Sequence, residues 1–328
     1  MELLTLNHSS YPRIGSSVDE QMLRRTIAER DRGEKTDADV RAAENHLVSL
    51  ALQDQHDAGI DVPTDGLIRW NDPVSHLAGK LEGMRVNGLL RYFDTNFYFR
   101  QPVVCGKIER SHPLVVNEFE WAAQRSPRPV KPVLTGPYTL TRLSLGDGEP
   151  GNSGALLMSY AEALGAEVAE LAAAGARLIQ VDEPGLLMHP ADLSLAREAL
   201  TLLAAHKGHA KLALATYFGD AAPLYPALQA LPFDILILDF TYSPTLPKVI
   251  ETDGSIKALG FGLLDGRNTR LEDQAAVAYQ LERMLTRVKP EPSYLTTSCG
   301  LEYLPRDRAR LKLSHLTSIK KSLLGKAA

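Results

Sequence analysis

The sequence predicts an α/β protein folded as a (β/α)8 TIM barrel with a hairpin-like insertion after the second strand. Short apolar runs alternate with longer amphipathic stretches, an order typical of a parallel sheet wrapped by helices. The length of 328 residues is slightly above the roughly 250 residues that one such barrel needs. No apolar run reaches the roughly 18 residues of a transmembrane helix, so we expect no membrane span.

The strands are predicted in chain order. The first two are short and end near Ser9–Ser10 and in the segment 62–66. Each of the later strands is mostly apolar and ends in polar residues or glycine. These lie within residues 131–139, 176–184, 211–218, 233–240, 256–266 and 293–301. A closed barrel uses all of them, although periodicity does not distinguish it from a doubly wound open sheet.

Helices are predicted between the strands, where apolar side chains recur at three- and four-residue spacing. The clearest patterns cover residues 153–175, 271–288 and 305–325. A stretch at 92–110 is instead rich in aromatic and β-branched residues, which favour a hairpin. We therefore expect residues 1–328 to form a single barrel domain with an insertion at approximately 85–130.

Composition argues against several classes of protein. Lys and Arg total 36 and Asp and Glu total 40, a net charge of −4 that argues against nucleic-acid binding. The two cysteines, Cys105 and Cys299, are too far apart in sequence to suggest a CxxC metal site or a disulfide framework. The start of the chain lacks the basic and apolar regions of a signal peptide. We expect a cytoplasmic protein without nucleic-acid or membrane partners.

Candidate site residues follow from the fold, because catalytic groups in such barrels stand at the carboxyl ends of the strands. Each polar strand end could also cap a helix, but a run of consecutive polar ends exceeds what a core requires. The candidates for substrate binding are Ser10, Arg13, Asp65, Tyr138, Thr139, Glu183, Thr216, Tyr217, Asp265, Arg267 and Asn268, and the candidates for catalysis are Asp182, Asp239 and Cys299.

Two of these strand ends, Asp182–Glu183 and Cys299, each allow more than one role. Asp182 and Glu183 are adjacent at a strand end, so at most one of them faces the mouth of the barrel. The inward carboxylate can bind an ammonium group or act as a base, or it can pair with a neighbouring strand. Cys299 ends the last strand and is either a nucleophile or metal ligand, if its thiolate is favoured, or a small buried residue. We interpret Cys105 as structural.

An ordered set of motifs resembles the cobalamin-independent methionine synthase family, from residue 10 to about residue 320. The motifs are SSYPRIG, TGPYTL, IQVDEP, LATYFGD, LLDGRN and TSCGLEYLP. That family has two related (β/α)8 barrels. The C-terminal barrel holds zinc and homocysteine, and the N-terminal barrel helps to hold a polyglutamylated folate. The resemblance implies a methyltransferase similar to 5-methyltetrahydropteroyltriglutamate–homocysteine S-methyltransferase, which methylates the homocysteine thiol in methionine biosynthesis.

The resemblance also implies an amino-acid pocket. Ser10 matches the family serine near the homocysteine carboxylate, and Asp182 matches the acid that holds the ammonium group. A family glutamate aligns with Leu67, and Asp65 is a candidate replacement for it.

The zinc ligands of the family transfer only in part. Leu214 and Thr216 stand at the positions of a His-x-Cys pair, and Asp239 stands at the position of a glutamate. Cys299 alone matches its family counterpart. The resemblance therefore leaves Cys299 and Asp239 as an incomplete metal set, and the motifs look closer to the non-catalytic N-terminal barrel.

Three functions remain open from the sequence. The first is a methyltransferase acting on a small thiol, with methyltetrahydrofolate, another donor or a corrinoid carrier. The second is a non-catalytic folate-binding or partner barrel of a split methionine synthase, working beside a second, zinc-bearing barrel chain. The third is a metal-free lyase or decarboxylase in which Asp182, Asp265 and Arg267 bind an acidic substrate.

Overall fold

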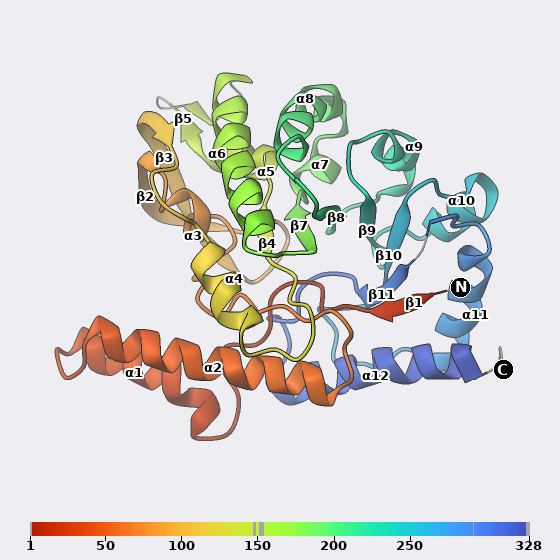
Figure 1. Ribbon diagram of the computed structural model, residues 1–328, viewed down its shortest axis with the longest axis horizontal. Coiled ribbons are helices and arrows are strands. Elements are labelled where there is room, and N and C mark those ends of the chain that lie inside the picture. Colours follow the sequence, from red (N-terminus) through yellow and green to blue (C-terminus); the bar gives the residue numbers. More distant parts are fainter. Residues whose placement is uncertain (1, 147–148, 151–153, 291, 326–328) are drawn as a thin grey trace.

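The computed structural model describes residues 2–146, 149–150, 154–290 and 292–325. Within these ranges the main sheet has seven parallel strands in the order β1-β11-β10-β9-β8-β7-β4 (Figure 1). Its strands are β1 (Leu3–Thr5), β4 (Val133–Thr135), β7 (Leu178–Asp182), β8 (Lys211–Thr216), β9 (Ile235–Asp239), β10 (Ala258–Leu264) and β11 (Ser293–Thr297).

A short extended segment at residues 61–63 closes this sheet into a barrel. On one side, the backbone N–H of Asn7, just after β1, donates to the carbonyl of Val62 at 3.1 Å. On the other side, the N–H of Lys131, just before β4, donates to the carbonyl of Pro63 at 2.9 Å. Both edges of the sheet are thus joined through one segment. The predicted (β/α)8 barrel is confirmed, and the open doubly wound sheet is wrong.

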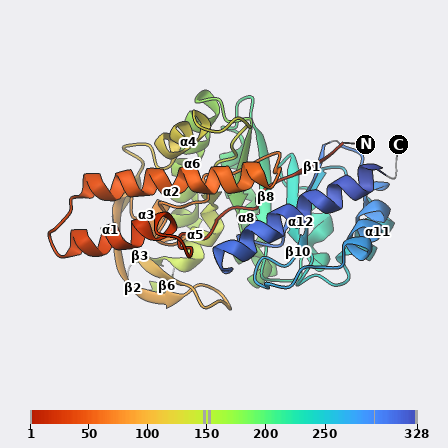
Figure 2. The same cartoon turned by 90° about the horizontal axis from the view of Figure 1, so that it is seen from below.

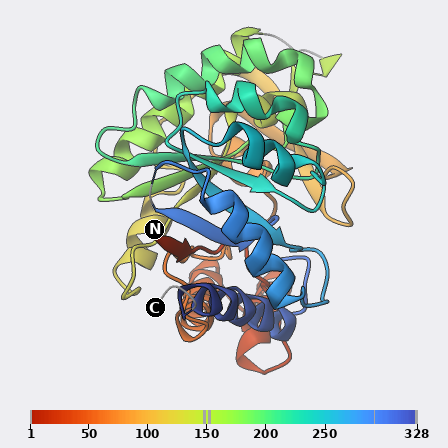
Figure 3. The same ribbon diagram turned by 90° about the vertical axis from the view of Figure 1, so that its right-hand side faces the viewer.

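Helices surround the barrel on the outside (Figures 1 and 3). The predicted amphipathic stretches are present as α6 (Gly154–Ala173), α11 (Gln274–Leu285) and α12 (Arg306–Gly325). The other helical elements are η1 (Asp19–Gln21), α1 (Met22–Asp31), α2 (Asp37–Asp57), α3 (Ser75–Ala78), α4 (Val116–Ala123), α5 (Pro137–Leu143), α7 (Gly185–Met188), η2 (Pro190–Asp192), α8 (Leu193–Ala204), η3 (Ala222–Leu224), α9 (Tyr225–Gln229) and α10 (Leu246–Asp253).

The first and last long helices, α2 and α12, lie side by side although they come from opposite ends of the chain (Figures 2 and 3). Arg306 of α12 is buried and donates through Nε to Asp54 of α2 at 2.9 Å. Arg310 donates to the other oxygen of Asp54 at 2.8 Å and also pairs with Glu20. This contact completes the ring of helices around the barrel.

The predicted hairpin follows the second strand position. β2 (Glu82–Arg91) and β3 (Tyr98–Glu109) pair antiparallel. They continue into a smaller sheet of order β2-β3-β5-β6, with β5 (Leu145–Gly146) and β6 (Glu149–Pro150). The turn at residues 92–97 is fixed by a hydrogen bond of 2.8 Å from the N–H of Tyr92 to the carbonyl of Phe97. The hydroxyl of Tyr92 in this turn lies 3.4 Å from that of Tyr217, which places the turn at the carboxyl ends of the barrel strands.

The barrel interior is apolar toward the amino-terminal ends of the strands and polar toward their carboxyl ends. A small cluster of alternate strand residues fills the lower part, among them Leu178, Ala213, Ile235, Ala258 and Tyr294. Because side chains alternate along a strand, Gln180 and Asp182 share the inward face with Leu178. Both are buried, so the upper interior contains polar groups that require hydrogen-bond partners.

In the helical layer, Glu167 of α6 forms a buried ion pair and also caps the start of a neighbouring helix. Its side chain is fully buried and pairs with Arg110 at 2.6 Å. Its two oxygens also accept the backbone N–H groups at the start of α4. The donors are Leu114 at 2.9 Å, Val115 at 2.6 Å and Val116 at 3.1 Å. The carboxylate therefore caps α4 from the neighbouring helix.

Replacing Glu167 with Ala is expected to lower the free energy of unfolding by about 3 kcal/mol, because three backbone N–H groups at the start of α4 lose their acceptor and Arg110 keeps only Glu170 as a partner. The matched control is Glu170→Ala, which removes the partly exposed partner of the same Arg110 and should cost less than about 1 kcal/mol. Urea unfolding followed by circular dichroism measures both losses. Equal losses in the two variants would contradict the capping role.

Candidate active site

A cavity at the carboxyl ends of the strands brings together four of the predicted residues: Ser10, Asp182, Tyr217 and Cys299. Its volume of about 20 Å³ accommodates about one water molecule. Tyr92 of the hairpin turn and Glu302 and Tyr303, which follow β11, also line it. The sequence analysis did not single out these three. The cavity is therefore closed by groups from both the barrel and its insertion.

Asp182 is buried at the base of this cavity. Its Oδ1 accepts a hydrogen bond from Gln180 Nε2 at 2.6 Å, and its Oδ2 accepts one from the Tyr217 hydroxyl at 3.1 Å. The hydroxyls of Tyr217 and Tyr92 are 3.4 Å apart. Burial raises the pKa of Asp182, and the bond from Gln180, the nearby Lys131 and the bond from Tyr217 oppose this rise. The carboxyl is thus fixed in place by contacts on both of its oxygens.

Lys131, another residue that the sequence analysis missed, supplies the counter-charge. Its Nζ donates to the carbonyl of His8 at 2.7 Å and to the side-chain oxygen of Gln180. Gln180 thereby connects the amine to Asp182, with its oxygen toward Lys131 and its NH2 group toward the carboxylate. Burial lowers the pKa of Lys131, and Asp182 opposes that effect. Burial, followed by the charge of Lys131, also holds the pKa of His8 well below its usual value.

Glu183 points away from the cavity, as the alternation of side chains along β7 requires. It accepts the backbone N–H groups of Tyr138 at 2.9 Å and Thr139 at 2.7 Å, and the Thr139 hydroxyl at 2.6 Å. Tyr138 donates its own hydroxyl to Asp192 at 2.7 Å. Burial raises the pKa of Glu183 to about 7 despite these bonds. The structure therefore places Tyr138, Thr139 and Glu183 together at the start of α5, outside the cavity.

Three other predicted residues stabilise turns or lie beside the cavity. Asp265 Oδ1 accepts the N–H of Arg267 at 2.8 Å, and Asn268 Oδ1 accepts the N–H of Arg270 at 3.0 Å. The Thr216 hydroxyl is buried and has no hydrogen-bond partner among the described residues. None of the side chains of Asp265, Asn268 and Thr216 lines the cavity. The hydrogen bonds of Asp265 and Asn268 show that these two stabilise their own turns.

Arg267 joins the barrel to the hairpin. Its guanidinium donates to the hydroxyl of Tyr242 and, at 3.3 Å, to the carbonyl of Asp94 in the hairpin turn. The guanidinium also lies 5.3 Å from the centre of the Phe218 ring, within the range of a cation–π contact. Arg267 thus positions the cover of the cavity, although it does not line the cavity itself.

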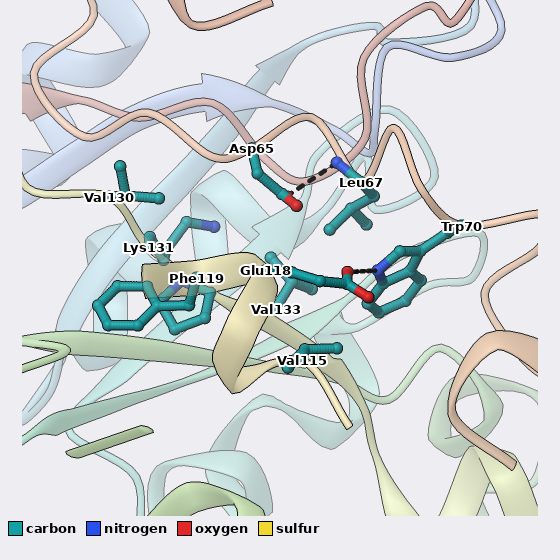
Figure 4. A pocket seen from close by; sticks show the side chains of 10 residues that line it. Asp65, Leu67, Trp70, Val115, Glu118, Phe119, Val130, Lys131 and Val133 are labelled. Atoms are coloured by element: carbon teal, nitrogen blue, oxygen red, sulfur yellow. Dashed lines mark hydrogen bonds between the residues drawn. The ribbon is translucent and has the colours of Figure 1, made fainter. Parts of the chain in front are cut away.

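Asp65 and Arg13 lie in neighbouring cavities. Asp65 lines a small cavity with Glu118 and Lys131 (Figure 4), and its Oδ1 accepts the N–H of Leu67 at 2.9 Å. Burial, followed by the negative charge of Glu118, raises the pKa of Asp65 to about 6. Arg13 donates to the carbonyl of Trp70 at 2.9 Å and lines a larger cavity that shares Ser10 and Glu302 with the central one.

The candidate metal ligands do not form a zinc site. Both oxygens of Asp239 are engaged: Oδ2 accepts the N–H of Phe218 at 3.1 Å, and Oδ1 accepts the N–H and hydroxyl of Thr241 at 2.8 and 2.6 Å. Cys299 is buried, and its thiol donates to the carbonyl of Gly300 at 3.5 Å. In the described part of the chain, no three His, Cys, Asp or Glu side chains lie close enough together to bind a metal.

Backbone strain is concentrated around the same cavity. Among the described residues other than glycine, Leu67, Phe93 and Phe218 have positive φ angles of 50°, 49° and 67°. Leu67 and Phe218 line the cavity, and the Phe93 ring lies 6.0 Å from the Phe218 ring. Such conformations are costly, and they cluster at functional sites. The strain points to this cavity independently of the polar contacts.

The residues that sequence reasoning missed differ in the signal that they carry. Glu302 lies within the motif TSCGLEYLP, three positions after Cys299 and just beyond the end of β11. Considering the turn that follows each strand, as well as the strand end itself, would have identified Glu302. Tyr92 belongs to the insertion and Lys131 precedes its strand. Neither position is marked by any pattern along the chain.

No helix in the described ranges combines the length and the apolar character needed to cross a lipid bilayer.

Comparison with known proteins gives consistent matches. Residues 11–322 match the family model described as "Cobalamin-independent synthase, Catalytic domain". A methionine synthase of Saccharolobus solfataricus is 33% identical over 305 residues, which cover 92% of this chain and 90% of that protein. One of Sulfurisphaera tokodaii is 32% identical over 308 residues, covering 92% and 89%. Because the matching model is that of the catalytic domain, the expected closer likeness to the non-catalytic N-terminal barrel is not supported.

Solved structures share the fold. A B12-independent methionine synthase from a Shewanella species, solved in complex with selenomethionine, superposes with a TM-score of 0.79 at 22% identity and covers 99% of this chain and 100% of that chain. A structure described as a putative vitamin-B12 independent methionine synthase, from Listeria monocytogenes, gives a TM-score of 0.75 at 16% identity, with coverages of 98% and 99%.

A zinc-binding measurement tests whether Asp239 and Cys299 can hold a metal. After dialysis against EDTA, incubation with equimolar zinc and desalting, the protein is expected to retain well under one zinc per chain, because Asp239 and Cys299 lack further ligands. Elemental analysis measures the content, with Cys299→Ser as the matched control. About one zinc per wild-type chain, lost in Cys299→Ser, would overturn this reading of the ligands.

Proposed function

The chain belongs to the cobalamin-independent methionine synthase family, and on that premise we propose that it transfers a methyl group to the thiol of homocysteine. The observation that carries the proposal is the cavity at the barrel mouth, where Asp182, Ser10 and Glu302 converge. Its position at the carboxyl ends of the strands is where such barrels place their active sites. Its groups are also those that a small amino acid with a thiol requires.

Asp182 is suited to the ammonium group of the substrate. It is buried and fixed by Gln180 and Tyr217, so it needs no reorganisation when a cation arrives. Among the described residues, the nearby cation is Lys131, which contacts Gln180 rather than the carboxylate itself. An entering ammonium group would therefore be the direct cationic partner of the carboxylate.

Ser10 is suited to the carboxylate end. Its hydroxyl is enclosed and lacks a hydrogen-bond partner among the described residues, and it lies where the central cavity meets the one lined by Arg13. An unpaired buried hydroxyl favours a ligand that accepts its proton. Arg13 adds a positive charge on the same side. A substrate bound between Asp182 and Ser10 would need this cavity to widen, because it holds about one water molecule as it stands.

The methyl donor is proposed to approach through the cavity that Arg13 and Asn71 line, since it shares Ser10 and Glu302 with the central one. We propose a donor of the methyltetrahydrofolate class, whose glutamate carboxylates suit Arg13. Methylcobalamin on a corrinoid carrier is the donor to compare with it. Cytoplasmic location and a second, zinc-bearing barrel chain as partner remain predictions from the sequence.

The other two functions considered from the sequence have weaker support. The incomplete zinc set is what motivates a non-catalytic folate-binding or partner barrel, but the family model that matches is that of the catalytic domain. A lyase using Asp265 and Arg267 is disfavoured by their positions, because neither lines the cavity that contains Asp182.

Replacing Asp182 with Asn is expected to weaken homocysteine binding at least about 10-fold, because it removes the charge that faces the ammonium group. Wild-type affinity should also fall as the pH is lowered through about 6, the raised pKa of Asp182, because the carboxyl is then protonated and loses its charge. Isothermal titration with homocysteine at several pH values measures both effects. Asp307→Asn, at an exposed helix start, is the control. Unchanged affinity in Asp182→Asn would remove Asp182 from the site.

A further inference from the structure

Methyl transfer to homocysteine, on which this inference rests, needs a thiolate. A free thiol is mostly protonated at neutral pH, and the thiolate is the reactive nucleophile. A bound metal can stabilise that thiolate, but in the described part of the chain Asp239 and Cys299 do not assemble a zinc site. A basic group inside the cavity would serve the same purpose by accepting the thiol proton.

Glu302 has the geometry for that role. Its Oε2 atom is enclosed and has no hydrogen-bond partner among the described residues. A Cβ atom placed on Gly300 would lie 2.3 Å from this oxygen and 2.0 Å from Ser10 Oγ. The unpaired carboxyl oxygen and the unpaired hydroxyl therefore converge on the space that the missing side chain of Gly300 leaves open. A buried acceptor without a donor is costly, and a substrate proton would satisfy it.

The other titratable groups of the cavity are less suited. Both oxygens of Asp182 already accept hydrogen bonds. The Cys299 thiol is buried and already donates to the carbonyl of Gly300 at 3.5 Å. The tyrosines are weaker acids still, because burial raises the pKa of Tyr217 well above its usual value. Glu302 is thus the carboxyl group of the cavity with a free oxygen.

The environment of Glu302 also raises its basicity. Burial, with a smaller contribution from the charge of Asp182, raises the pKa of Glu302 to about 7, against hydrogen bonds from its own backbone and from Tyr303. A base works best when its pKa lies near the working pH. At neutral pH a substantial fraction of the Glu302 side chains is ionised, and each of these is a stronger base than an exposed carboxylate.

We propose that Glu302 is the general base that activates the substrate thiol for methyl transfer. The S–H bond breaks, its electron pair stays on sulfur, and the proton moves to Oε2 of Glu302. The sulfur then forms a bond to the methyl carbon while the bond from that carbon to the donor breaks. The electron pair of the broken bond stays with the donor. Where the donor leaves as an anion, it takes the proton back from Glu302.

Glu302→Gln tests this assignment with an isosteric amide that accepts no proton. Methionine formation is measured by mass spectrometry with methyltetrahydrofolate, methylcobalamin or methyl iodide as donor. We expect kcat/KM to fall at least about 100-fold, while homocysteine affinity measured by titration stays within about threefold. The wild-type rate should rise with pH through about 7, the pKa of Glu302, and the variant should lack this rise. Glu302→Asp should restore part of the activity.

Glu251→Gln, which makes the same change at the partner of Arg283 far from the cavity, should behave like the wild type. A Glu302→Gln variant that is folded by circular dichroism and keeps both the rate and the pH profile overturns the assignment. Activity that depends on about one bound zinc and disappears with EDTA also overturns it. If the wild type makes no methionine from either natural donor, the proposed function fails. The comparison with methyl iodide then still decides whether Glu302 activates the bound thiol.

Discussion

The barrel mouth depends on one buried charge balance, that between Lys131 and Asp182. Each charge alone would cost several kcal/mol to bury, yet both are enclosed within the upper interior. The Gln180 amide lies between them, accepting from the amine and donating to the carboxylate. This arrangement fixes Asp182, which in turn accepts from Tyr217, whose hydroxyl meets that of Tyr92. The hairpin therefore closes on a carboxylate that the barrel has already oriented.

The acids around the mouth show that contacts, not pKa values, separate structural from chemical roles. Burial raises the pKa of both Glu183 and Glu302 to about 7. The carboxylate oxygens of Glu183 accept three hydrogen bonds at the start of α5. Glu302 keeps one enclosed oxygen without a partner in the described part of the chain. A protein can tolerate that deficit where a ligand repairs it, so the unsatisfied oxygen is the more informative observation.

Sequence reasoning predicted the barrel because period and strand length are local signals, and it placed Asp182 and Tyr217 near one another because strand ends converge in any such barrel. The same rule also selected Asp239 and Asp265, which bind backbone N–H groups of their own turns. Along the chain, a turn-capping aspartate and a substrate-binding one look alike. Tyr92 escaped prediction because its place depends on how the hairpin folds back over the barrel, a long-range contact that no local pattern encodes.

The closed mouth also limits how a substrate enters. The cavity of about 20 Å³ is too small for an amino acid, so part of its wall must move. The Asp182 network lies in the barrel interior and includes Tyr92 of the hairpin turn, and the turn is also held by the bond from Arg267 to the carbonyl of Asp94. The strained Phe93 belongs to that turn, and the strained Phe218 lies beneath it. The strained backbone therefore lies where the hairpin meets the barrel, and positive φ angles of this kind are typical of functional sites.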